Sequence, residues 1–405
     1  MTQWLKKTFV IVLAGLTIIA CRVVPSEEGE LRGQILVWHG WSGQEAIILD
    51  QLLDQFMTIY PGVTIVHESR PLAEIGDEFM DEATFGMGPD LLIAPAKWEQ
   101  MLAEAGVIQD LSKQTIDTSI YLPTLIDQLH TQDDLYALPL SAHTYALYYN
   151  KTMVTEPPAT LTDLLNRAAE GQPVALEITF YGAFWGVQAS GGQLDAQGRV
   201  ALDQKSVADW LTWLNQAQTE PNIILSHDEE LLYNLFREGQ VAYYVGGPDR
   251  LLALQQALGP EVAGVAPLPG TPGNPAGPFL QAEALMFNAA STPAQTAVAL
   301  ELVRFLTNEA QQTKLARQAG RVPANARVRI DPRVSPAVAG FMAQTKTAVP
   351  LPSTPSGGQA LFQGDLIYVQ TLEGVLEPAE AAKELVTQFN SILINPPSGG
   401  DSDVE

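Results

Sequence analysis

Strand-like and helix-like segments alternate along most of this chain of 405 residues. Residues 35–38 have the pattern of a short buried strand, and 45–60 places apolar side chains at i+4 spacing on one face of a helix. Pro61-Gly62 ends that helix, and 63–66 follows as the next strand. This βαβ opening predicts an α/β fold with mainly parallel sheets, in which ligands bind beyond the carboxyl ends of the strands.

The same alternation continues to about residue 390, a length that exceeds what one hydrophobic core serves, so we expect two domains. The further predicted strands are 91–93, 136–138, 146–149, 174–178 and 241–245. The further predicted helices are 98–105, 161–169, 206–217, 229–237, 293–306, 309–319 and 379–390.

The N-terminus has the pattern of a targeting segment. Lys6 and Lys7 precede an apolar run, 8–20, that is shorter than the ~20 residues a transmembrane helix needs. Cys21 follows this run and is the only cysteine, so it has no partner for an internal disulfide. The pattern resembles the lipobox of a bacterial lipoprotein, and we expect 1–21 to be a lipoprotein signal peptide with its lipobox and Cys21 to be lipidated. An uncleaved anchor, or a plain signal peptide with a free cysteine, is the alternative.

Charge narrows the choice of partners. The chain has 46 acidic and 22 basic residues, a net charge of −24, which repels phosphate backbones and anionic headgroups. We therefore expect no nucleic-acid partner, and membrane contact through the lipid on Cys21 alone. The location is predicted to be extracytoplasmic, lipid-anchored to the cell membrane, in the periplasm or at the cell surface. Residues 22–33 are expected to be a flexible tether, and 396–405 a disordered acidic tail.

No enzyme signature is found: the sequence lacks a G-x-S-x-G elbow, an H-E-x-x-H pair, a P-loop and a dinucleotide-binding glycine motif. Residues 227–230 are interpreted as a helix cap and not a metal site, and Trp210 and Trp213 as core residues and not sugar platforms. Tyr243 and Tyr244 do not form an iron-binding pair, because neighbouring strand residues point to opposite faces. We expect no enzymatic activity, no metal and no cofactor.

Six short motifs stand in a fixed order across the chain. They are ILVW (35–38), GPDLL (88–92), the segment 138–151 ending in YYNK, FREGQVA followed by GGP (236–248), FNAAS (287–291) and RVPA (321–324). Together they resemble the solute-binding proteins of ABC importers, specifically the maltose/maltodextrin-binding-protein-like family 1 group. The resemblance runs from about Ile35 to Asn390.

That resemblance implies a two-lobe, type II periplasmic-binding-protein-like fold that closes on a sugar and delivers it, as a monomer, to the transmembrane subunits of an ABC permease. Lobe one is expected at 34–142 plus 285–332, and lobe two at 143–284 plus 333–395. Because closure responds only to contacts made in the closed state, the ligand contacts should come from both lobes.

Matching motif to motif implies a set of ligand contacts in the cleft. They are His39, Trp41, Ser42, Lys97 and Trp98, then His143 and Tyr145 at the crossover, and Tyr181, Gly247, Asp249, Arg250 and Phe362 from the second lobe. The three tryptophans that form the maltodextrin platform in this family match Ala94, Asp249 and Leu361. We therefore expect a carbohydrate ligand other than a maltodextrin, with stacking faces supplied by the remaining aromatic residues.

Two alternatives remain open from the residues. One is a binding protein for another polar solute, such as a polyamine, a polyol phosphate or a metal chelate, for which Asp249 and the acidic surface would suit a cation. The other is a secreted enzyme or a sensor subunit, since paired carboxylates far apart in the sequence leave no motif.

Overall fold

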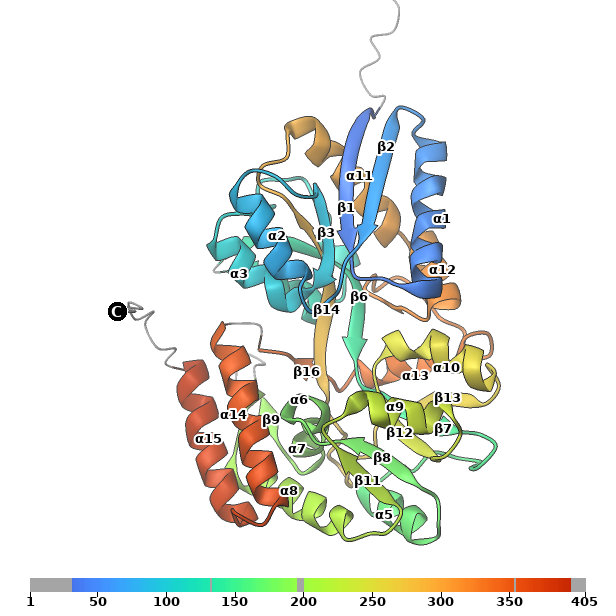
Figure 1. Cartoon of the computed structure of the whole chain (residues 1–405), viewed down its shortest axis with the longest axis vertical. Coiled ribbons are helices and arrows are strands. Elements are labelled where there is room, and N and C mark those ends of the chain that lie inside the picture. Colours follow the sequence, from blue (N-terminus) through green and yellow to red (C-terminus); the bar gives the residue numbers. More distant parts are fainter. Residues whose placement is uncertain (1–30, 132, 195–199, 353–354, 395–405) are drawn as a thin grey trace, which may run out of the picture.

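The computed structural model describes residues 31–394, except 132, 195–199 and 353–354 (Figure 1). Two bodies, each a β-sheet flanked by helices, lie one above the other, and strands β6 and β14 run between them (Figure 1). We call the body built on the seven-stranded sheet lobe one, and the body built on the five-stranded sheet lobe two. The α/β prediction is confirmed. The predicted signal peptide with Cys21, most of the tether and the acidic tail lie outside the described residues.

The sheet of lobe one has the order β15-β6-β14-β3-β1-β2, with β16 beside β14. Its strands are β1 (Gly33–His39), β2 (Val63–Ser69), β3 (Leu91–Pro95), β6 (Ala137–Thr144), β14 (Phe279–Phe287), β15 (Val322–Pro323) and β16 (Val349–Pro350). The βαβ opening is confirmed, because β1 pairs in parallel with β2 and β3.

The sheet of lobe two has the order β11-β8-β12-β7-β13. Its strands are β7 (Ala146–Asn150), β8 (Val174–Glu177), β11 (Ile223–Ser226), β12 (Tyr243–Gly246) and β13 (Ala263–Ala266). Two small antiparallel pairs lie outside the main sheets: β4 (His130–Thr131) with β5 (Asp134–Leu135), and β9 (Gln193–Leu194) with β10 (Val200–Ala201).

The expectation of mainly parallel sheets was wrong, because both sheets are mixed. In lobe one, β14 runs antiparallel to β3 and to β6, and in lobe two β7 runs antiparallel to β12 and β13. The antiparallel strands lie near the crossovers. At these points the chain arrives from the other lobe, and no helix on the same sheet connects the paired strands. A right-handed helical crossover, which would make the pairs parallel, is therefore absent at these points.

Helices cover the sheets. They are α1 (Gly43–Ile59), α2 (Ile75–Thr84), α3 (Glu99–Glu104), α4 (Pro123–Ile126), α5 (Leu161–Ala169), α6 (Phe180–Ala183), α7 (Trp185–Ala189), α8 (Gln204–Gln218), α9 (Glu229–Arg237), α10 (Leu251–Leu258), α11 (Pro293–Thr307), α12 (Glu309–Ala319), α13 (Pro336–Gln344), α14 (Pro355–Leu372) and α15 (Pro378–Ile394). Short 3-10 helices are η1 (Ala96–Trp98), η2 (Thr118–Ile120), η3 (Asp127–Leu129) and η4 (Pro248–Arg250). Among the described residues, none of the helices is both long enough and apolar enough to span a bilayer.

Local signals explain why these helices begin and end where they do. In α1, Ile48, Leu52 and Phe56 are buried on one face at the predicted i+4 spacing. The side chain of Asp228 accepts a hydrogen bond from the backbone N–H of Leu231, which confirms the predicted cap of α9. Gly320 ends α12 in the left-handed region, with φ of 70°, and so turns the chain into the interlobe region.

The aromatic pairs that invited a binding role are core residues. Trp210 and Trp213 stack with ring centroids 4.9 Å apart, and Trp210 also packs on Trp185 inside lobe two. Tyr243 and Tyr244 point to opposite faces of β12: the hydroxyl of Tyr243 donates to Gln172, and that of Tyr244 donates to Glu229. Both interpretations made from the sequence are therefore confirmed.

The core role of Trp210 can be tested by its effect on stability. Trp210→Ala should lower the free energy of unfolding by about 3–5 kcal/mol, because the side chain is fully buried and its removal leaves a cavity. Urea unfolding followed by circular dichroism measures this loss. The exposed Val375→Ala should change stability by less than about 0.5 kcal/mol. A stable Trp210→Ala protein would contradict the assignment.

Candidate functional site

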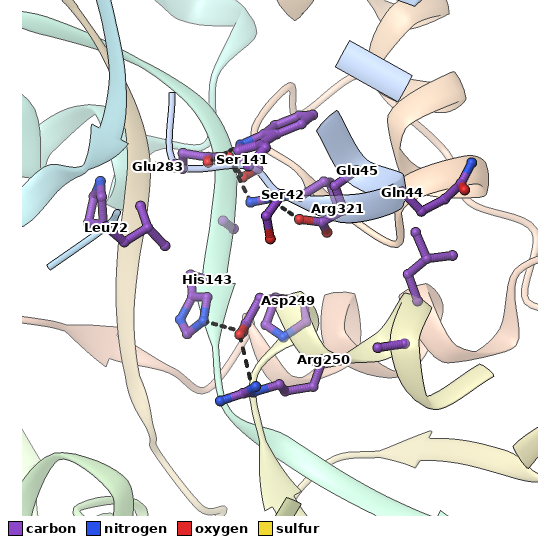
Figure 2. Close-up of a pocket in the computed structure, with 18 of the residues that line it drawn as sticks. Ser42, Gln44, Glu45, Leu72, Ser141, His143, Asp249, Arg250, Glu283 and Arg321 are labelled. Atoms are coloured by element: carbon purple, nitrogen blue, oxygen red, sulfur yellow. Dashed lines mark hydrogen bonds and ion pairs between the residues drawn. The ribbon is translucent and has the colours of Figure 1, made fainter. Parts of the chain in front are cut away.

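A cavity of about 530 Å³ lies between the two lobes. The turn before α1 and the start of that helix line it from lobe one, together with residues of β6 and β14, and η4 and α10 line it from lobe two (Figure 2). Of the predicted contacts, Trp41, Ser42, His143, Asp249 and Arg250 lie in its wall. Segments more than 200 residues apart in the chain thus meet at one site.

A buried ion network forms the lobe-one wall. Arg321 follows the end of α12, and its Nη2 lies 2.8 Å from Glu45 Oε2 in α1, while its Nη1 lies 3.0 Å from Glu283 Oε2 in β14. The hydroxyl of Ser141 donates to Glu283 Oε2 at 2.8 Å, and the indole N–H of Trp41 donates to Glu283 Oε1. Each of these three charged side chains therefore has an ionic partner in a region that excludes most water, although one guanidinium serves two carboxylates.

Trp41 lies in the cavity wall but offers little of its ring. The guanidinium carbon of Arg321 is 4.2 Å from the centre of the indole ring, a cation–π contact, and only 2% of the residue is exposed. The stacking role expected for Trp41 would require it to be uncovered. In this structure the indole instead holds Glu283 and Arg321 in place.

Burial sets the protonation behaviour of the network. Burial raises the pKa of Glu45, with the charge on Arg321 opposing this shift and that on Glu283 adding to it. For Arg321, burial alone would lower the pKa, but the carboxylates of Glu283 and Glu45 outweigh it and raise the pKa. Two atoms of this pair, Glu45 Oε1 and Arg321 Nε, are buried and have no hydrogen-bond partner among the described residues.

A second polar group lies across the cavity from this network and is made of His143 from β6 with Asp249 and Arg250 from η4 of lobe two. His143 Nε2 lies 2.9 Å from Asp249 Oδ1, and Arg250 Nε lies 3.7 Å from Asp249 Oδ2 (Figure 2). Burial would raise the pKa of Asp249, but the hydrogen bond and charge of His143 and the charges of Arg250 and Arg321 outweigh it and hold the pKa at about 2. Because 46% of the side chain is open to the cleft, solvent screening weakens the effect of this pairing on stability.

Gly247 lies directly behind this pair. A Cβ atom at Gly247 would lie 2.4 Å from Asp249 Oδ1 and 2.5 Å from His143 Nε2, closer than any ordinary contact. Any larger residue would push the two side chains apart. Gly247 was predicted as a contact residue, and the structure places it as the residue whose lack of a side chain makes room for the contact between His143 and Asp249.

His39 lies behind the cavity wall and not in it. Because the backbone N–H of Trp41 donates to His39 Nδ1 at 3.2 Å, His39 Nε2 carries the proton and donates to His67 Nδ1 at 3.1 Å. His67 Nε2 in turn lies 3.1 Å from Asp50. Burial, followed by the neighbouring His67, lowers the pKa of His39 to about 4. His39 therefore positions the turn that carries Trp41.

The other predicted contacts lie outside the cavity wall. Lys97 is exposed, with its Nζ 5.0 Å from the ring centre of Trp98, and the Trp98 ring packs so closely on Gly76 that a Cβ there would lie 2.1 Å away. Tyr145 and Tyr181 contact each other edge to face, with centroids 5.3 Å apart. Phe362 projects from α14 with 59% exposure. The assignment of the ligand contacts stays a prediction.

Sequence reasoning missed several residues of the wall. Glu45, Glu283 and Arg321 carry its charge, and Tyr233 and Gln281 also line it. One signal was present: Glu283 is the only charged residue in 279–287, an otherwise mostly apolar strand. In the part of the chain that the structure describes, no group of three or more histidine, cysteine, aspartate or glutamate side chains is placed to hold a metal.

The pKa of His39 predicts how stability depends on pH. With a pKa of about 4 when folded and about 6.5 when unfolded, the histidine takes up a proton more readily in the unfolded chain. Stability should therefore fall by up to about 3 kcal/mol as the pH drops from 6.5 to 4. His39→Asn, which keeps an acceptor for the backbone N–H, should flatten this dependence in urea unfolding at pH 7, 5.5 and 4.5.

His227 is exposed, so His227→Asn serves as the matched control, and its stability should depend on pH as that of the parent protein does. A His39→Asn profile as steep as that of the parent would contradict the role given to His39.

Comparison with known proteins adds the family context. Residues 51–343 match the family described as bacterial extracellular solute-binding protein. The maltotriose-binding protein of Pyrococcus abyssi is 27% identical over 350 residues, which cover 80% of this chain and 74% of that protein. The galactooligosaccharide-binding protein of Bacillus subtilis is 25% identical over 342 residues, 77% of this chain and 79% of that protein.

Solved structures share the fold. The GacH receptor of Streptomyces glaucescens, whose structures include an unliganded form and complexes with acarbose, has a TM-score of 0.80 at 22% identity, over 90% of this chain and 100% of that chain. The maltose-maltodextrin binding protein of Alicyclobacillus acidocaldarius has a TM-score of 0.75 at 24% identity, over 88% and 100%. The predicted two-lobe fold is confirmed.

Proposed function

The chain belongs to the bacterial extracellular solute-binding protein family, and from this premise we propose that it binds a carbohydrate between its lobes and delivers it to an ABC permease. Because proteins of this family bind solutes outside the cytoplasm, the predictions of a binding protein without enzymatic activity and of an extracytoplasmic location hold for the family as a whole. The sugar, the permease and the anchor belong to the proposal.

One observation carries the sugar assignment: the wall of the interlobe cavity contains buried polar atoms that lack partners. They are Glu45 Oε1, His143 Nδ1, Gln281 Oε1 and Arg321 Nε. Leaving such groups unpaired costs about 1–3 kcal/mol each, so a solute with many hydroxyl groups would recover this free energy on binding. The relatives named for maltotriose and galactooligosaccharide support the same class of solute.

The shortage of open aromatic faces supports a sugar other than a maltodextrin. Trp41 and Tyr233 are the aromatic residues of the cavity wall, and both are almost completely covered. Long maltodextrins expose extended apolar faces that aromatic platforms match. Polar recognition of a smaller or more strongly polar saccharide fits this wall better.

Closure of the two lobes would complete the site. The predicted lobe bounds, 34–142 with 285–332 and 143–284 with 333–395, stay a proposal; they divide β14, whose residues 279–284 pair with β6 and β16 in the sheet of lobe one. We infer that the monomer closes about β6 and β14, the strands that run between the two bodies (Figure 1). A solute that contacts both Ser42 in lobe one and Gln256 in lobe two would favour the closed state.

A thermal-shift screen of the mature chain tests this function. A sugar at 100 times its Kd should stabilise the protein by about 2.7 kcal/mol, which raises the melting temperature measurably. Mono- and oligosaccharides, polyamines and divalent metals form the panel. A response to a polyamine or a metal with none to any sugar would move the assignment to the other class of solute.

The sugar found in the screen can then locate the site. Ser42→Ala and Gln256→Ala, from opposite lobes, should each weaken binding about 2- to 10-fold in calorimetry, because each removes about one net hydrogen bond. Gln216→Ala on α8 is exposed outside the cavity and should leave the affinity unchanged. Equal affinities for all three variants and the parent would place the sugar elsewhere.

The lipid anchor has its own test. Cys21 follows an apolar segment and is the only thiol in the chain. Cys21→Ser should release the protein from the membrane fraction and abolish incorporation of a labelled fatty acid, because no other acylation site of this kind remains. Membrane retention of Cys21→Ser would show that the segment acts as an uncleaved anchor.

A further inference from the structure

The charges around the cavity are unbalanced. Arg321 pairs with Glu45 and Glu283, so one guanidinium lies between two carboxylates. Arg250 also faces an excess of negative charge. Its carboxylate partners are Glu229, Glu230 and Asp249. The described groups around this cavity therefore carry more negative than positive charge, and a neutral ligand would not compensate this excess.

Two carboxylate oxygens in this wall have no hydrogen bond to any residue that the structure describes. Glu45 Oε1 is buried and has no hydrogen-bond partner among the described residues. Asp249 Oδ2 has its ion-pair partner, Arg250 Nε, at 3.7 Å, beyond hydrogen-bond range. An acidic cluster alone would not define a site, but here Glu45, which carries a buried oxygen without a donor, lines a cavity large enough for a solute.

The two oxygens belong to opposite lobes. Glu45 lies in the first turn of α1 in lobe one, and Asp249 lies in η4, directly after β12 in lobe two. Figure 2 shows the pair of Arg321 and Glu45 on one side of the cavity and Asp249 with His143 on the other. A group that donates to both would link the lobes.

A sugar hydroxyl cannot both donate to the two carboxylate oxygens and balance their negative charge. It donates one hydrogen bond and carries no charge, so it satisfies one oxygen and leaves the charge unbalanced. A protonated amino group has at least two N–H donors and one positive charge, and its bonds to carboxylates are roughly twice as strong as those between neutral groups.

We propose that the solute is a saccharide with a basic nitrogen, whose ammonium group donates one N–H to Glu45 and another to Asp249 across the closed cleft. This inference rests on the proposed sugar-binding function and adds the chemical class of the sugar. The remaining hydroxyls would pair with Gln281 and His143, whose Oε1 and Nδ1 are buried without partners. Because the ammonium contacts both lobes only after closure, it would shift the protein toward the closed state.

Calorimetry with matched pairs of saccharides tests the class. The pairs are glucosamine with glucose, galactosamine with galactose, and acarbose, which contains a secondary amine, with maltotetraose. The mature chain should bind the amine of at least one pair tenfold or more tightly than its neutral partner at low ionic strength. Equal binding, or tighter binding of the neutral sugars, would overturn the amino-sugar class but leave the proposed function standing.

Two carboxylate variants test the residues. Asp249→Asn and Glu45→Gln, which keep the size of each side chain, should each reduce the preference for the amine about tenfold and change the affinity for the neutral sugar less than threefold. Glu261→Gln removes the same charge at an exposed position outside the cavity wall, without an ion pair to either arginine of the cavity, and should change the preference less than twofold. A preference that survives in both variants would overturn the assignment to Glu45 and Asp249.

Three further measurements distinguish a failure of the amino-sugar assignment from a failure of the proposed sugar binding. Circular dichroism melting shows whether each variant is folded, so that a loss of binding is not a loss of structure. Tighter binding of putrescine or spermidine than of any amino sugar would overturn the saccharide part of the inference. Absence of binding for every saccharide, charged or neutral, would overturn the proposed function together with the inference.

Discussion

The buried pairing of Arg321 with Glu45 and Glu283 is the interaction on which the interlobe region depends. It joins the first turn of α1, the middle of β14 and the second residue after α12, three segments that are distant in the chain. Taking charges out of water costs several kcal/mol per ion, and only complete pairing offsets that penalty. The network therefore forms only when all three segments are in place, and it requires the left-handed turn at Gly320 that directs Arg321 inward.

This network also determines what the lobe-one wall can do. Trp41 is held by Glu283 and covered by Arg321, so an aromatic residue that would suit sugar stacking becomes part of a rigid polar wall. On the other side of the cavity, the space at Gly247 allows His143 and Asp249 to meet. Both walls thus present polar groups with fixed orientations before a solute arrives, which reduces the ordering cost of binding.

Local patterns predicted much of the secondary structure. The bounds of α5, α9 and α12 agree with the predicted ranges because a capping side chain precedes each helix, and each helix has an acidic first turn and buried apolar residues on one face. The predicted direction of the strands at the crossovers was wrong, because this direction depends on how the chain returns from the other lobe. Short helices such as α6 and α7 were not predicted, because four or five residues show no periodicity.

The sequence by itself determined the α/β alternation, the core role of Trp210 and several residues that line the cavity, including Ser42, His143 and Asp249. Only the tertiary structure decided which charges meet there. Glu45 and Arg321 leave no local pattern, and Glu283 leaves only a lone charge in an apolar strand, because their pairing joins positions 276 and 38 residues apart in the chain. Periodicity and capping act within a few residues, whereas a buried ion network arises when packed lobes exclude water from charges that the chain brings together.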